Sequence, residues 1–291
     1  MEFLQPATWH EALEARAEHP EARPIFGGTD VMVELNFDRD RPGALLDLTR
    51  VPELSEWGEE DGMVRIGAGV SYARIIEEVG GRLPALAMAS RTVGSPQIRN
   101  RGTVGGNLGT SSPAGDSLPP LYAAGAEVEV CSVRGVRRVS VEEFVRGPKR
   151  NALAGDELIS AVVVPVARGP EQFSKIGTRN AMVIAVCSLA VSLDVERRKV
   201  RACIGSAGPT PIRAREAEGF IEGVLDEEGL WESRGEIGEE ALGRFAELVR
   251  EAARPIDDVR STAEYRRHAV GVLARRELAW VWQEYRGGEA R

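Results

Sequence analysis

The sequence reads Gln97-Ile98-Arg99-Asn100-Arg101-Gly102-Thr103-Val104-Gly105-Gly106-Asn107 at its most informative place, and it runs on to Ser112-Pro113-Ala114-Gly115-Asp116. A second glycine-rich segment precedes it, Pro24-Ile25-Phe26-Gly27-Gly28-Thr29-Asp30. Adjacent glycines let the backbone approach a ligand without a Cβ in the way, and consecutive N–H groups in such turns bind anions. Two such segments predict a pyrophosphate held from two sides, and hence a dinucleotide.

The segment from Gly94 to Pro120 is rich in Gly, Ser, Asn and Pro, and we interpret it as one long loop. Long loops in compact domains are usually functional, so it is expected to bind a cofactor. Thr103 offers a hydroxyl, Asn107 an amide, and Asp116 a carboxylate that could accept hydrogen bonds from sugar hydroxyls. The Gly27-Gly28 pair taken alone would be interpreted as a structural turn.

A third glycine segment, Ile66-Gly67-Ala68-Gly69-Val70-Ser71, has the first two glycines of a Rossmann fingerprint. Tyr72 stands where the third glycine belongs, and no acidic residue follows on a strand about twenty residues later, as that motif requires. A tight structural turn is therefore favoured over a nicotinamide-type dinucleotide site.

The composition bounds the class of protein. The chain has 291 residues, enough for two domains, and a formal net charge of −8, which lacks the basic footprint of a nucleic-acid-binding protein. Three cysteines, at positions 131, 187 and 203, are widely spaced and are expected to be core thiols. The N-terminus shows no secretion signal. The longest apolar run, 181–193, is too short for a membrane span, so we expect a soluble, cytoplasmic protein.

Hydrophobic patterning divides the chain near residue 168. Before the break, the pattern predicts a small strand–helix–strand unit over 23–48, preceded by a helix over 8–19 that opens with the capping box Thr8–Glu11. It also predicts strands over 63–69, 126–131, 138–141 and 157–166 and helices over 72–78 and 142–145. After the break it predicts strands over 172–176, 181–195 and 199–205, then helices from 213 onward, including 239–252 and a last one opening at 261–264.

The chain offers little acid–base chemistry of its own. His10, His19 and His268 lie in no nucleophile or metal motif, so no catalytic residue and no metal ligand is expected. An organic cofactor would have to carry any reaction. Lys175 and Arg179 flank a Gly-Thr turn, and two interpretations stay open: a solvated strand end, or a place for Lys175 near a flavin or phosphate oxygen.

These motifs, in this order and over nearly the whole chain, resemble the FAD-binding medium subunit of the molybdenum hydroxylases. That group includes xanthine dehydrogenase, carbon monoxide dehydrogenase and bacterial aldehyde or nicotine dehydrogenases. Phe26-Gly27-Gly28-Thr29-Asp30 stands for the family's Ala-Gly-Gly-Thr-Asp. The segment 66–71, the long loop through Ser117, and Lys175-Ile176-Gly177-Thr178-Arg179 complete the match. The long loop is the specific part.

The resemblance implies an α+β fold. Residues 1–167 would form an FAD-binding domain of the vanillyl-alcohol-oxidase (PCMH) type, with two α+β subdomains covering roughly 1–57 and 58–167. Residues 168–291 would form a C-terminal domain with a small antiparallel sheet and a helix bundle.

The resemblance also implies the cofactor contacts. Residues 24–31 would wrap one side of the FAD pyrophosphate and residues 103–107 the other, and Asp116 would hydrogen-bond to the sugar or ribitol. By the same resemblance, Val93, Leu158 and Lys175 would contact the adenine or the flavin, and Ile184 would approach the isoalloxazine ring. The residues of the two loops are Pro24, Ile25, Phe26, Gly27, Gly28, Thr29, Asp30, Val31, Thr103, Val104, Gly105, Gly106 and Asn107.

In function, the resemblance implies the flavoprotein subunit of a larger oxidoreductase, in a dimer of heterotrimers. A large partner subunit would carry the molybdenum cofactor, and a small one would carry two [2Fe-2S] clusters that pass electrons singly to FAD. The flavin would hand them to NAD, a quinone or oxygen. Two alternatives stay open: a free-standing FAD-dependent oxidoreductase of the same fold, and a non-catalytic nucleotide-binding module. The chain departs from the family at Phe26, where relatives have a small residue, and at Val183, where many carry an acidic one.

Overall fold

The chain folds into two units in the computed structural model, which describes residues 1–288. The first unit comprises residues 1–75, 95–112 and 125–165. The second comprises residues 76–94, 113–124 and the described part of 166–291. The two units therefore interleave along the sequence, and the glycine-rich segment 94–120 contributes to both.

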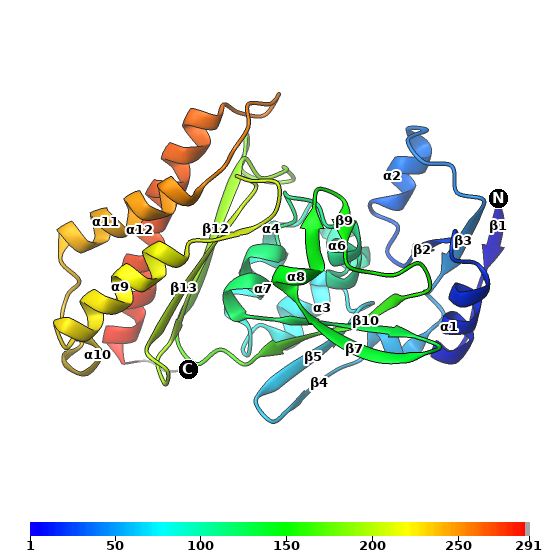
Figure 1. Ribbon diagram of the computed structural model, residues 1–291, viewed down its shortest axis with the longest axis horizontal. Coiled ribbons are helices and arrows are strands. Elements are labelled where there is room, and N and C mark those ends of the chain that lie inside the picture. The colour runs from blue at the N-terminus through cyan, green and yellow to red at the C-terminus, as the bar shows by residue number, and fades with distance from the viewer. Residues whose placement is uncertain (289–291) are drawn as a thin grey trace. The chain divides into compact units, whose positions relative to one another are not determined.

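A parallel three-stranded sheet opens the first unit, in the order β1-β3-β2 (Figure 1). Helix α2 (Val31–Asn36) connects β2 to β3, which confirms the predicted strand–helix–strand unit. Strand β1 is an addition that local patterning did not predict, because its three residues gain their order only by pairing with β3. The bounds are β1 (Glu2–Leu4), β2 (Arg23–Ile25) and β3 (Ala44–Asp47).

An antiparallel five-stranded sheet forms the rest of this unit, in the order β4-β5-β10-β6-β7. Its central strand, β10, is buried along most of its length, as a continuous β-branched run predicts. The predicted strands over 63–69, 126–131, 138–141 and 157–166 all occur here, within a few residues. The bounds are β4 (Trp57–Glu60), β5 (Met63–Gly67), β6 (Glu127–Ser132), β7 (Gly135–Ser140) and β10 (Leu158–Pro165).

Short helices and a hairpin complete the first unit. Helix α1 (Trp9–Glu18) begins at the predicted capping box, in which the Thr8 hydroxyl accepts the Glu11 N–H at 3.2 Å. The other elements are the 3₁₀ turn η1 (Pro52–Ser55), α3 (Tyr72–Arg74), α5 (Pro96–Arg101), α6 (Val104–Thr110), α8 (Val141–Phe144), β8 (Val145–Gly147) and β9 (Arg150–Asn151).

The expectation of one long loop over 94–120 is wrong. The segment holds three helices, α5, α6 and α7 (Leu118–Ala124). Ser95 caps α5, with Pro96 at its first turn, and Thr103 caps α6, so small polar residues and proline here begin helices rather than a continuous loop.

The second unit is a four-stranded antiparallel sheet, β11-β12-β13-β14, between helical layers. Helices α9 and α12 lie on one face of β12 and β13, with α11 packed on both helices (Figure 1). Helix α7 lies against the opposite face of these strands, and α4 packs on β11. The bounds are β11 (Glu171–Ile176), β12 (Cys187–Asp194), β13 (Lys199–Gly205), β14 (Ile212–Arg213), α4 (Pro84–Thr92), α9 (Arg215–Glu227), α10 (Leu230–Ser233), α11 (Glu239–Ala252) and α12 (Ala263–Gly287). The π-helical turn η2 (Ile75–Val79) begins the stretch 76–94 of this unit.

The predicted sheet followed by helices is confirmed for this unit, with one correction. The strand expected over 181–195 begins only at Cys187, and the apolar residues before it belong to the β11–β12 loop. All three cysteines are free and buried, as expected. Within residues 1–288, no helix has the length and apolar character needed to cross a membrane.

Candidate functional site

The two glycine-rich segments meet inside the first unit. Gly27 lies so close to the backbone carbonyl of Arg101 that a Cβ at position 27 would overlap it. Next to this contact, the Tyr72 N–H donates to the Gly102 carbonyl at 3.0 Å, and Thr103 forms a β-bridge with Ser71. The turn after β5, the 24–31 loop and the start of α6 therefore converge in one place.

The two members of each glycine pair have different surroundings. A Cβ at Gly27 would overlap Arg101, and one at Gly105 would overlap the backbone of Ala68, so packing within the protein requires these two glycines. Gly28 has a φ of +73°, and its nearest neighbours would be side-chain atoms. Gly106 is exposed, and its Cβ would meet only the Thr103 hydroxyl among the described atoms. The second glycine of each pair is thus the one whose open side could face a ligand.

The side chains around these glycines are held in place by the fold. The Thr103 hydroxyl accepts the Gly106 N–H at 2.9 Å and so is occupied as the cap of α6. The Phe26 ring lies against Gly69, which leaves no space there for a Cβ, so the departure at Phe26 fills the unit's own interior. Val104 and Leu158 are buried in the core. Pro24 and Ile25 belong to β2, while Thr29, Asp30 and Val31 lead into α2 and Asn107 lies within α6.

Helix α2, which follows the 24–31 loop, is tied down by a charged cluster. Glu34 accepts from the Lys149 ammonium at 2.5 Å and from the Arg23 guanidinium at 3.0 Å. The Lys149 hydrogen bond is the main reason that the pKa of Glu34 lies below its usual value. These pairs fix α2 to β2 and to the β8–β9 hairpin.

In the second unit, Asp116 and Lys175 form a buried ion pair. The Lys175 ammonium lies 2.5 Å from Asp116 Oδ2, and both side chains are less than a tenth exposed. Lys175 also donates to the Thr92 carbonyl at 3.0 Å, and the Thr92 hydroxyl donates to the same Asp116 oxygen at 3.0 Å. The interpretation of Lys175 as a solvated strand end is therefore wrong, whereas Arg179 is exposed and donates to its own loop.

The second oxygen of Asp116 tests whether a cofactor fits here. Oδ1 is buried and has no hydrogen-bond partner within residues 1–288, although Oδ2 has two. Burial raises the pKa of this carboxyl, and Lys175 opposes the rise. A buried acceptor without a donor costs free energy unless a ligand or water supplies one. A sugar or ribitol hydroxyl is the kind of donor that this oxygen lacks, so Asp116 fits the contact expected of it.

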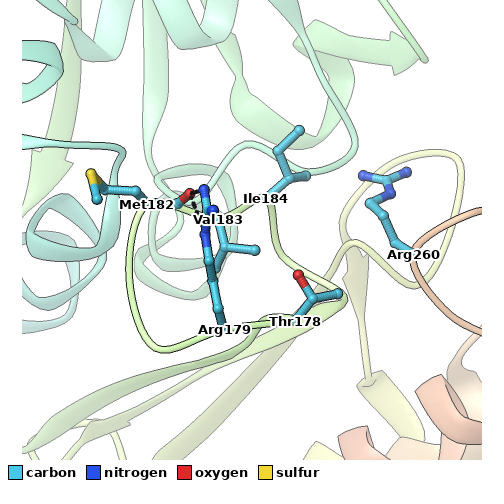
Figure 2. A pocket seen from close by; sticks show the side chains of 6 residues that line it. All are labelled: Thr178, Arg179, Met182, Val183, Ile184 and Arg260. Atoms are coloured by element: carbon cyan, nitrogen blue, oxygen red, sulfur yellow. Dashed lines mark hydrogen bonds between the residues drawn. The ribbon is translucent and has the colours of Figure 1, made fainter.

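The other expected contacts of this unit are Val93 and Ile184. Val93 directly follows α4, next to Thr92, and is half-buried. Ile184 is 59% exposed and lines an open pocket of about 400 Å³ in the β11–β12 loop. Figure 2 shows Arg179 turned back toward the Met182 carbonyl and Arg260 reaching the pocket from a separate loop. Val183, the second departure from the family, lies in the same wall.

Sequence reasoning missed Glu171, the first residue of β11. Its carboxylate is buried and accepts the Ala85 N–H at 3.1 Å, in the first turn of α4. Burial raises the pKa of Glu171 to about 7, against the opposing effects of the Ala85 N–H and the Ser192 hydroxyl. An acidic residue at a strand end carries no local signal of burial, because the helix that covers it lies 86 residues earlier in the chain.

Comparison with known proteins assigns both halves of the chain to families. Residues 1–167 match the family described as the FAD binding domain in molybdopterin dehydrogenase, and residues 172–281 match the CO dehydrogenase flavoprotein C-terminal domain. The nicotine 6-hydroxylase medium subunit of Paenarthrobacter nicotinovorans is 30% identical over 283 residues, covering 95% of each chain. The xanthine dehydrogenase FAD-binding subunit of Escherichia coli O157:H7 is 29% identical, covering 95% of this chain and 94% of that one.

A solved structure agrees in fold. A chain of the carbon monoxide dehydrogenase from Hydrogenophaga pseudoflava superposes with a TM-score of 0.88, at 26% identity and with 98% of each chain covered. The expected fold, an FAD-binding domain followed by a C-terminal domain with a small sheet and helices, is thereby confirmed. The chain belongs to the family of FAD-binding subunits of the molybdenum hydroxylases, and its cofactor is FAD.

Proposed function

We propose that this chain is the electron-transferring flavin subunit of a molybdenum-containing dehydrogenase or hydroxylase. It would take electrons from [2Fe-2S] clusters of a small partner subunit, while a large partner subunit carries the molybdenum cofactor and oxidises the substrate. An acceptor such as NAD or a quinone would then receive the electrons. The names of the relatives support a subunit of such an enzyme, and a dimer of heterotrimers in the cytoplasm is the assembly that we propose.

Bound FAD supplies the redox chemistry, accepting electrons one at a time and releasing them in pairs. The role of the chain is to bind and orient it. In the first unit, the backbone of residues 24–31 and 103–107 would hold the pyrophosphate, with the open sides of Gly28 and Gly106 toward it. In the second unit, Asp116 Oδ1 would accept from a cofactor hydroxyl, and Lys175 would keep that carboxylate ionised through the 2.5 Å pair.

One observation carries the proposal: Gly27 and Arg101 bring the two glycine-rich segments into backbone contact. This contact places the Gly27-Gly28 turn beside the segment that leads into α6, the helix that carries Gly105 and Gly106. Val93, Leu158 and Ile184 are proposed as secondary contacts to the adenine or flavin. Of these, Leu158 is 2% exposed and could offer a ligand little beyond its backbone.

The test is purification of the full chain with and without its genomic neighbours. We expect the chain to take up FAD on reconstitution, with a flavin absorbance that dithionite bleaches. We expect co-expression to recover a complex that contains molybdenum and iron. Turnover of an organic substrate by this chain alone would favour the free-standing oxidoreductase instead. Nucleotide binding without a reducible chromophore would favour the non-catalytic module.

A further inference from the structure

Strand β11 contacts helix α4 at both of its ends. Side chains alternate between the two faces of a strand, so Glu171, Phe173 and Lys175 share one face. Glu171 accepts the Ala85 N–H at the start of α4, and Lys175 donates to the Thr92 carbonyl at its end. The four steps from Glu171 to Lys175 span about 13 Å of strand, and the eight steps from Pro84 to Thr92 span about 12 Å of helix. The strand and the helix therefore match in length.

The signs of these charges suit the helix. A carboxylate at the N-terminus and an ammonium at the C-terminus both complement the helix dipole. Pro84 has no N–H to satisfy, and the cap residue Leu83 has no polar side chain. Glu171 therefore provides from another element the cap that the helix's own sequence lacks. The far end of the same helix bears Thr92, which holds both members of the Asp116–Lys175 pair.

We propose that Glu171 is a positioning residue for the FAD site, whose ionised carboxylate holds α4 so that Thr92 keeps Asp116 and Lys175 in their binding arrangement. This inference rests on the proposed role of Asp116 in FAD binding. Glu171 itself touches neither Asp116 nor Lys175 in the contacts described above, so its effect passes through the helix.

The surroundings of Glu171 make its charge sensitive to pH near neutrality. Its pKa of about 7 results from burial, and within the described chain no charged side chain contributes to it. The charged groups on the elements packed around it include Lys175 on β11 itself, Arg91 in the last turn of α4, Asp194 on β12 and Arg82 in the segment before α4. Helix α12, which also packs on β11, carries the buried Glu277 beside Ser174. Protonation would remove the charge at the start of α4 while leaving these groups unchanged.

The test measures FAD affinity of the full chain at pH 6, 7 and 8 by flavin fluorescence, for the wild type, Glu171→Gln and Glu171→Asp. We expect wild-type affinity to rise about fivefold from pH 6 to pH 8, which corresponds to about 1 kcal/mol. Glu171→Gln should be flat across this range at the weaker value, because it keeps the hydrogen bond without the charge. Glu171→Asp should recover part of the pH dependence, because it restores the charge on a shorter side chain.

A second readout needs no flavin. In the apo chain at pH 8, hydrogen exchange of the first-turn α4 amides, measured relative to that of the buried β12 amides, should be slower in the wild type than in Glu171→Gln. The matched control is Glu196→Gln, an exposed carboxylate in the same unit, which should keep the wild-type profile.

The outcomes separate the two proposals. A Glu171→Gln chain that keeps the wild-type pH profile of affinity, or equal α4 protection in both chains, would overturn the positioning role alone. Failure of the wild type to bind FAD at any pH would overturn the proposed function and this inference with it. If Glu171→Gln does not fold, the wild type is compared with Glu171→Asp instead. Equal FAD affinity and an equal pH profile in these two chains would contradict the proposal that the glutamate carboxylate must reach the start of α4.

Discussion

Gly27 packs directly on the backbone carbonyl of Arg101, and this contact joins two segments that are far apart in the sequence. A carbonyl cannot move aside as a flexible side chain can, so the contact excludes every residue with a Cβ. The glycine is thus required by packing in the protein itself, in addition to any ligand it faces.

Gly27→Ala should therefore destabilise the first unit and impair FAD binding together. Overpacking a fixed backbone contact costs about 1–3 kcal/mol. Urea unfolding of the apo chain measures the stability loss, and reconstitution measures flavin content. The control is Gly58→Ala, where an added Cβ would meet no described atom within 4 Å. A Gly27→Ala chain as stable as that control would show that the two segments can separate without cost.

The Asp116–Lys175 pair allows stability to be separated from binding. Asp116→Asn leaves the Lys175 charge buried without its carboxylate, and breaking a buried ion pair costs about 3–5 kcal/mol. Adding Lys175→Met removes that stranded charge, so the double variant should regain most of the lost stability. It should still bind FAD poorly, because the ionised carboxylate is gone. Recovery of both properties in the double variant would contradict a cofactor role for Asp116.

Glu171 should make the fold less stable as the pH rises. Its folded pKa, about 7, lies above the ordinary glutamate value of 4.5, so between these values the folded chain binds more protons than the unfolded chain. Stability from this group is present below the lower value and is lost as the pH rises to about 7. A difference of this size is worth on the order of 3 kcal/mol at most. Urea unfolding at pH 5 and pH 8 should show the slope in the wild type and a shallower one in Glu171→Gln.

This sign is opposite to the expected effect on affinity. At pH 8, Glu171→Gln should be the more stable chain and the weaker FAD binder. A purely structural role would move both properties in the same direction, so the opposite signs at one pH are diagnostic.

Glu277 should be a second site of strain in the core of the second unit. It is fully buried on α12, and Ser174 lies near its carboxylate without forming a hydrogen bond of regular geometry to either oxygen. Burial raises its pKa well above the usual value, and Ser174 opposes the rise only in part. The stability that this group contributes therefore falls as the pH rises above the pKa of an ordinary glutamate.

Replacing this side chain with an apolar one of similar length should relieve the strain. Glu277→Met should stabilise the chain by about 1–2 kcal/mol at pH 8, where the penalty is largest. It should have a smaller effect at pH 5. Thermal unfolding at both pH values is the measurement, with the exposed Glu284→Met on the same helix as control. A destabilised Glu277→Met chain would indicate that the carboxyl has a partner, such as a bound water.

Much of the fold follows from local pattern, and the exceptions have physical causes. The helical spacing at α11 is set by burial on one face, which the sequence displays directly. Strand β6 is buried on both faces, and its alternation is visible because Glu127 and Glu129 occupy one face and Val128 and Val130 the other. Strand β1 carries no such signal, because its three residues are ordered by the register with Ala44 to Leu46. The run 181–186 resembles a strand because it is apolar, but it belongs to the β11–β12 loop, in which residues 182–184 line the open pocket.

The candidate site divides in the same way. The glycine pairs can be recognised in the sequence because they allow unusual backbone conformations. Asp116 can be recognised because its carboxylate follows a Ser-Pro turn. Thr92 and Glu171 do not, since their importance depends on how α4 packs on β11 across the sequence. Lys175 could be singled out as a cation, but its burial against Asp116 depends on the same tertiary contact.

The alternation of β11 has a consequence for how this family can vary. Its odd-numbered residues Glu171 and Lys175 meet α4 and Asp116, whereas Ser174 looks toward Glu277 on the other side. Inserting or deleting one residue between 171 and 175 would point the Lys175 ammonium toward the apolar helical layer and leave Asp116 without its counter-ion. Substitutions along this strand are therefore compatible with the site only if the spacing between Glu171 and Lys175 remains an even number of residues.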